Sequence, residues 1–73
     1  MSPQLKAQEI IDYIAGTHIR QYGKIHMKRV LEEASTNTRL IIKNRIVDGL
    51  DATYWREVRK NIIALQCILL AKK

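Results

Sequence analysis

The 73-residue sequence contains few of the residues that build disulfide-bonded, sheet-rich or membrane-spanning proteins. Its one cysteine, Cys67, has no partner for an internal disulfide, which favours a reducing, cytoplasmic location. One Pro and three Gly supply little of the turn chemistry that a many-stranded sheet requires. The longest apolar stretch, 62–71, is interrupted by Gln66 and is too short to span a bilayer. We therefore expect one small helical domain with neither a secretion signal nor a membrane partner.

The sequence also lacks the residue groupings on which enzymes and metal sites depend. His18 and His26 do not form an i, i+4 ligand pair, and Cys67 has no second cysteine at metal-binding spacing. There is no Gly-rich phosphate-binding loop and no pair of titratable groups suited to acid–base catalysis. We expect no enzymatic activity, no metal, no cofactor and no small-molecule substrate. His18 is expected instead to be a hydrogen-bonded core residue of the first helix.

Positive charge is in excess, with 13 Lys and Arg against 7 Asp and Glu and a net charge of +6. The excess is greatest in residues 18–47, where Glu32 and Glu33 are the acidic residues. A basic middle indicates an anionic partner, which could be a nucleic acid or an acidic protein surface. The alternative is a solvated face without a partner.

Capping signals and apolar periodicity predict a first helix over residues 3–22. Ser2 is suited to the N-cap, Pro3 to the first helical position and Gly23 to the position after the last turn. The apolar residues Ala7, Ile10, Ile11 and Ile14 then share one helical face. Ile25, in the short connector that follows, is expected to enter the core.

The middle of the sequence has the spacing of a helix-turn-helix motif. It predicts a helix over 27–34, a polar turn over 35–38 and a second helix over 39–47. β-branched residues lower the helix propensity of the last segment, so a strand is the alternative there. In a helix-turn-helix the second helix would lie in a DNA major groove, where Arg and Asn can bind purine edges. The candidate contacts to phosphates or base edges are Thr38, Arg39, Lys43, Asn44 and Arg45.

The strongest periodicity predicts a long amphipathic helix over residues 52–72. Gly49 is expected to end the preceding helix, and Asp51 or Thr53 to cap this one. The expected core stripe comprises Tyr54, Val58, Asn61, Ile62, Leu65, Ile68 and Leu69. The fold class is therefore all-α, a single domain over 1–73 with about four helices and a helix-turn-helix-like core.

The last helix carries a second face that begins basic and ends apolar. Ile63, Cys67 and Leu70 recur at i, i+4 and i+7 opposite the core stripe. This face is either a docking surface for a partner or a second copy, or it is covered by the first helix. Trp55 could add a binding hot spot, although a half-buried Trp closing the bundle is the favoured interpretation. The candidate partner-binding residues are Lys28, Arg29, Trp55, Arg56, Arg59, Lys60, Ile63, Cys67 and Leu70.

Residues 27–47 resemble the small DNA-binding domains of bacterial and phage regulators. In size, charge and helical content, the whole chain resembles the very small basic helical proteins with which phages reprogramme host RNA polymerase. That resemblance implies a regulator in the host cytoplasm that binds an RNA polymerase subunit, inhibits initiation and promotes antitermination. The alternatives are a helix-turn-helix repressor that binds double-stranded DNA and a self-associating scaffold protein that forms a homodimer.

Overall fold

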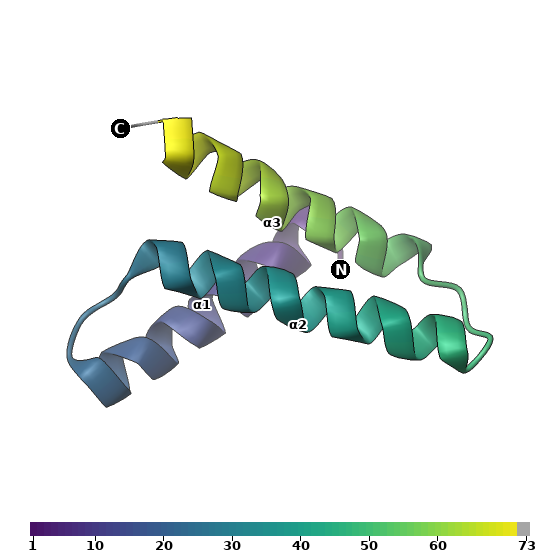
Figure 1. Cartoon of the computed structure of the whole chain (residues 1–73), viewed down its shortest axis with the longest axis horizontal. Helices are drawn as coiled ribbons and strands as arrows, with labels where there is room; N and C mark the ends of the chain where they lie inside the picture. Colours follow the sequence, from purple (N-terminus) through teal and green to yellow (C-terminus); the bar gives the residue numbers. More distant parts are fainter. Residues whose placement is uncertain (72–73) are drawn as a thin grey trace.

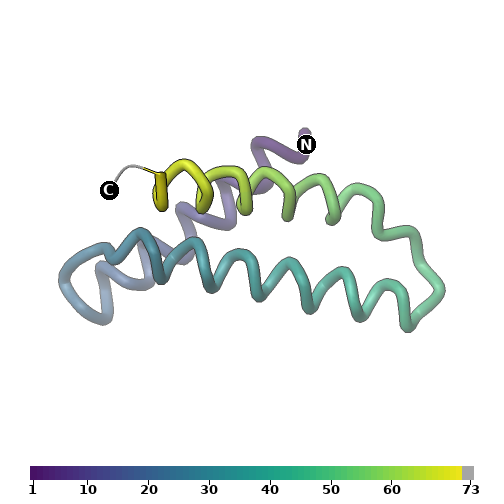
Figure 2. Tube along the Cα trace, turned by 45° about the horizontal axis from the view of Figure 1, so that its top comes forward, coloured from purple at the N-terminus to yellow at the C-terminus, as the bar shows by residue number. Residues whose placement is uncertain are grey.

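A computed structural model describes residues 1–71, which form three α-helices. Helix α1 spans Pro3–Tyr22, α2 spans Met27–Val47 and α3 spans Thr53–Ala71. Helices α2 and α3 form an antiparallel hairpin, and α1 packs obliquely across one side of it (Figures 1 and 2). The all-α prediction is confirmed, whereas the prediction of four helices is wrong. Residue 72 of the expected last helix lies outside the described residues.

Helix α1 begins and ends where its capping residues predict. The hydroxyl of Ser2 accepts a hydrogen bond from the Leu5 amide at 3.2 Å, and Pro3 follows at the first position. Gly23 adopts a φ of 72°, and its amide donates to the Ile19 carbonyl at 2.9 Å. Only glycine takes this left-handed conformation readily, so Gly23 ends the helix at Tyr22.

Helix α2 is continuous, which overturns the predicted helix-turn-helix unit. Residues 35–38, expected to form a turn, lie in the middle of the helix. Ser, Thr and Asn each cost only about 0.5–0.7 kcal/mol relative to Ala in a helix interior, which tertiary packing readily offsets. Thr38 is fully buried, and its hydroxyl donates to the carbonyl of Ala34 at 2.9 Å within the same helix. No Pro or Gly interrupts residues 27–47, so nothing forces the chain to turn there.

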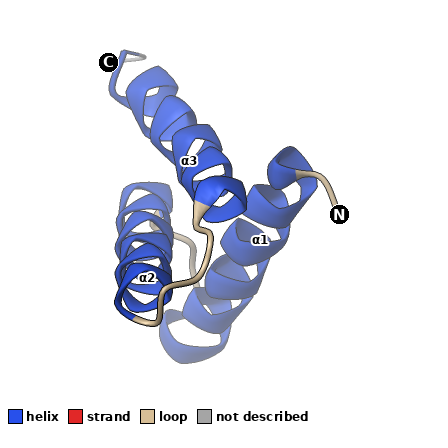
Figure 3. Cartoon of the chain, turned by 90° about the vertical axis from the view of Figure 1, so that its right-hand side faces the viewer, coloured by secondary structure: helices blue, strands red, loops and turns tan. Residues whose placement is uncertain are grey.

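The core lies where α1 crosses the hairpin. Figure 3 shows the three helices from the side of the turn that joins α2 to α3. The core consists of Ala7, Ile11 and Ile14 from α1, Val30, Leu31 and Ala34 from α2, and Val58 and Ile62 from α3. Three expected core residues are exposed instead. Leu65 and Ile68 are exposed because α1 runs obliquely and leaves the C-terminal half of α3 partly uncovered, and Ile25 lies in the connector before α2. Ile25 is 43% exposed, Leu65 38% and Ile68 52%.

The turn between α2 and α3 is held by a network of local hydrogen bonds. Gly49 has a φ of 73°, and its amide donates to the Ile46 carbonyl at 3.1 Å. The Leu50 amide donates to the Arg45 carbonyl at 2.8 Å, which completes a Schellman motif. Gly49 thus ends α2 as predicted.

Asp51 then starts the last helix. Its carboxylate accepts bonds from the amide of Thr53 at 3.1 Å and from the hydroxyl of Thr53 at 2.7 Å. These bonds lower the pKa of the Asp51 carboxyl, and the nearby Arg45 and Arg56 lower it further. Asp51 thus stabilises the start of α3 through Thr53, although the residue directly before the helix is Ala52, whose carbonyl accepts a hydrogen bond from the Arg56 amide at 2.9 Å. Of the described helices, none is long and apolar enough to cross a membrane.

Candidate protein-binding surface

The C-terminal half of α3 is apolar on all sides, although the other two helices cover only part of it. Gln66 is the one polar residue from Ile62 to Ala71. Ile62 is buried and Leu69 packs against the core, but Leu65, Ile68 and Leu70 are exposed. A helix that is apolar all round is normally covered, so this segment has surface available for a partner.

The predicted partner-binding residues of α3 follow one side of the helix at i, i+3 and i+4 spacing. Arg56, Lys60, Cys67 and Leu70 are exposed, whereas Arg59 and Ile63 are half-buried. The Nε atom of Arg59 is buried without a hydrogen-bond partner. This side therefore combines exposed cations in its first half with apolar side chains in its second half, as expected.

Lys28 extends this surface onto α2, but Arg29 does not. Lys28 lines a small hollow with Leu70 and Gln66 of α3. Arg29 is exposed in a separate hollow that it shares with Glu33 and residues further along α2. The structure thus brings Lys28, but not Arg29, next to the predicted face of α3.

Trp55 has the packing role that the sequence favoured. It is half-buried against the core, and its ring meets that of Tyr54 edge-to-face at 5.6 Å. The ammonium of Lys6 lies 5.9 Å from the Trp55 ring centroid. Lys6 also bonds Glu9 at 2.8 Å, which raises the pKa of the lysine.

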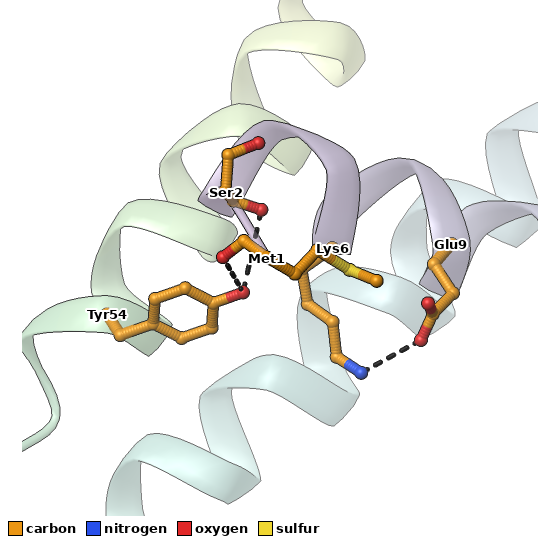
Figure 4. Close-up of polar contacts among 5 residues, drawn as sticks. All are labelled: Met1, Ser2, Lys6, Glu9 and Tyr54. Carbon is orange, nitrogen blue, oxygen red and sulfur yellow. Dashed lines mark hydrogen bonds and ion pairs between the residues drawn. The ribbon is translucent and has the colours of Figure 1, made fainter.

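Tyr54 holds the start of the chain against α3. Its hydroxyl donates to the Met1 carbonyl at 2.9 Å, close to the Lys6–Glu9 ion pair (Figure 4). The Tyr54 and Trp55 side chains therefore fix the N-terminal part of α1 onto the hairpin.

The predicted DNA-contact residues do not form a recognition helix that follows a turn. Thr38 is buried and bonded to its own helix, so it cannot reach a phosphate. Arg45 donates from Nε to the Asp51 carbonyl at 2.7 Å and thereby supports the turn. Arg39, Lys43 and Asn44 are exposed along the continuous helix.

His18 is a core residue, as expected from its position on the apolar face. It is 3% exposed, and its Nε2 lies 3.0 Å from the Glu33 carboxylate. The ring also meets Tyr22 edge-to-face at 5.6 Å. The pair thus joins α1 to α2. Within residues 1–71, no group of three or more His, Cys, Asp or Glu side chains could hold a metal ion.

A second groove, which the sequence did not reveal, lies on the other side of α3. It has a volume of about 260 Å³ and is formed by all three helices. Its lining residues are Gln8, Ile11, Met27, Leu31, Leu65, Ile68 and Leu69. Periodicity placed Leu65 and Ile68 in the core, because it identifies an apolar face but not the element that covers it. The one sequence feature that could have indicated this groove is the apolar character of α3 on every side.

Comparison with known proteins finds no matching family model, no similar curated protein and no similar solved structure.

Proposed function

We propose that the protein is a small regulator that acts by docking on a subunit of host RNA polymerase, where it inhibits initiation or promotes antitermination. The observation that carries this proposal is the side of α3 on which Cys67 and Leu70 are exposed beside Arg56 and Lys60. Apolar side chains next to cations suit a protein partner with an acidic rim around an apolar patch.

The two parts of this surface have different roles in binding. Arg56 and Lys60 accelerate encounter with an acidic surface and make it sensitive to salt. Burial of Cys67, Leu70 and the exposed part of Ile63 slows dissociation. Support for polymerase as the partner comes from the resemblance in size, charge and helical content.

Direct binding of double-stranded DNA is the competing proposal, for which Arg39 and Lys43 are the exposed candidates. Its original basis, a recognition helix placed after a turn, is lost because α2 is continuous. DNA binding would weaken by orders of magnitude between about 50 and 200 mM salt, since each neutralised phosphate releases counterions. A contact with an apolar centre should persist across that range.

The test is capture of purified RNA polymerase by the immobilised protein at both salt concentrations. Cys67→Asp places a charge at the exposed centre of the surface, and Ile63→Asp places one at its half-buried edge. The matched control is Val47→Asp, since Val47 is 75% exposed at the other end of α2. We expect wild type and control to retain polymerase, and both α3 variants, with helical circular dichroism intact, to lose it.

Equal capture by folded Cys67→Asp would overturn this placement of the docking surface. Failure of the wild type to bind polymerase, combined with salt-sensitive retention of a DNA duplex, would replace the proposal with DNA binding. A protein that binds neither and sediments as a dimer would support the self-associating scaffold.

A further inference from the structure

The groove on the second side of α3 continues around the beginning of α2. The groove lined by Leu65 and Ile68 shares Met27 and Leu69 with a hollow that also includes Ile25 and Leu70. Together these form one surface, which we call the open groove. It lies where the beginning of α2 faces the end of α3, at the left of Figure 1.

The lining of the open groove is mostly apolar, and its polar members are Gln8, His26 and Lys28. Ile11 and Leu31 form its buried floor, while Met27, Leu65 and Ile68 form partly exposed walls. Apolar side chains of this kind accept the apolar face of an amphipathic helix, which inserts residues spaced at i, i+3, i+4 and i+7. Lys28 is the charged residue that lines the groove.

Cations outnumber anions at this end of the molecule. Two carboxylates lie beside the groove: Glu32 lines a neighbouring hollow with Lys28 and Leu70, and Asp12 accepts a hydrogen bond from Gln8. The two segments that build this end of the molecule, 13–31 and 58–71, contain no Asp or Glu. They hold six cations, which are Arg20, Lys24, Lys28, Arg29, Arg59 and Lys60. Lys28 lines the groove itself, whereas Arg29 lies in the separate hollow with Glu33 and Lys60 is paired with Glu57. The first turn of α2 contains no acidic residue either, and the His26 side chain does not cap it. The partial positive charge of that helix end therefore adds to the field of the lysines.

We propose that the open groove binds an amphipathic helix of another protein whose polar face is acidic. Its apolar side chains would pack between Met27 of α2 and Leu65 and Ile68 of α3. Its carboxylates would face Lys24, Lys28 and the beginning of α2. A second copy of this chain fits less well, because it would bring the same cations together. The inference rests on the proposed protein-binding role, but not on polymerase being the partner.

The test uses amide NMR spectra of the full chain titrated with two synthetic helical peptides. Both peptides carry Leu at i, i+3, i+4 and i+7, and they differ only in having Glu or Lys on the polar face. We expect the Glu peptide to shift the amides of residues 25–31 and 64–71 and to bind at least tenfold more tightly than the Lys peptide. The charge-dependent part of this preference should diminish as salt is raised.

Ile68→Glu is the variant that tests the groove itself. Ile68 is 52% exposed, so the substitution places an anion in the groove without emptying the core. We expect Ile68→Glu to lower the affinity for the Glu peptide at least tenfold. The control Val47→Glu, which makes the same charge change at the other end of the hairpin, should leave that affinity unchanged.

Equal affinity for the two peptides, or shifts outside these residues, would overturn the proposal. So would concentration-dependent shifts of the same residues without peptide, because the occupant would then be a second copy. The two proposals fail separately. If Cys67→Asp loses polymerase capture and Ile68→Glu keeps it, the proposed polymerase-docking surface is supported. Whether the open groove binds an acidic helix is then decided by the peptide titrations alone.

Discussion

The two ends of the α2–α3 hairpin are built on different principles. At the turn end, residues 45–56, the Schellman motif at Gly49, the Asp51–Thr53 bonds and the Arg45–Asp51 bond fix the chain locally. At the open end, where residues 13–31 meet 58–71, Gly23 also ends a helix, but Ile25 is exposed and His26 does not cap α2. Both ends expose apolar side chains, including Val47 and Leu50 near the turn. The difference is that local hydrogen bonds fix the chain at the turn end, whereas at the open end the apolar side chains line a groove.

The largest expected effect separates the two halves of α3. Ile62 is fully buried, so Ile62→Ala should reduce the free energy of unfolding by about 2–5 kcal/mol. Ile68→Ala, at the open end, should cost about 0.5 kcal/mol or less, since its side chain is largely in solvent. Urea denaturation followed by circular dichroism measures both. Similar losses would mean that the open end is as tightly packed as the centre.

A proline in α2 tests whether the helix that joins the two ends is continuous. Asn37→Pro should cost about 3 kcal/mol or more, because it removes a helical hydrogen bond and clashes with the preceding turn. The control, Asn37→Ala, should be neutral or slightly stabilising. If residues 35–38 formed the turn of a helix-turn-helix, the proline would be tolerated with little loss in thermal stability.

The two left-handed glycines provide a matched pair, one at each end. Gly23→Ala and Gly49→Ala should each cost about 1–2 kcal/mol, the penalty of a side chain in that conformation. An added Cβ would meet no atom within 4 Å at either site, so the cost is one of backbone conformation alone. Thermal unfolding of both variants measures it. A negligible loss at one of them would show that its helix can end without a left-handed residue.

The smallest expected effect is the pH dependence of the stability that Asp51 contributes at the turn end. The bonds from Thr53 lower the pKa of Asp51 from its ordinary value of 3.8, so the ionised carboxylate stabilises the fold. This contribution is fully present above about pH 4 and is lost as the pH falls through the lowered pKa. Asp51→Asn should be less stable than wild type at pH 7, and the difference should shrink near pH 3. Urea midpoints at the two pH values measure it, and a constant difference would contradict this role of Asp51.

The sequence predicts α1 well, because its start and end depend on local chemistry at Ser2, Pro3 and Gly23. The same holds for Gly49 and Asp51 at the turn. It does not predict α2, because the polar residues at 35–38 favour a turn locally and Thr38 becomes helical only through burial against its neighbours. Packing of this kind is set by residues distant in the chain.

Of the two candidate binding surfaces, likewise, the sequence predicts one and not the other. Helical spacing places Cys67 and Leu70 on one side of α3, and both are exposed as expected. The open groove could not be inferred, because it depends on the oblique path of α1 and on which part of α3 that path leaves uncovered. Leu65 and Ile68 share the periodicity of buried Ile62, so only their place along the helix distinguishes them.

The short turn between α2 and α3 also has a kinetic consequence. Helices that are neighbours in sequence can pair through local contacts, and helical domains of this kind fold within microseconds to milliseconds. We expect the turn end to form early, with its Schellman bonds already in place in the transition state for folding. The open end, which lacks such bonds on α2, should be the last part to become ordered and the first to exchange its amide hydrogens. The folding nucleus and the open groove would then lie at opposite ends of one hairpin, so that substitutions in the groove alter binding with little effect on the folding rate.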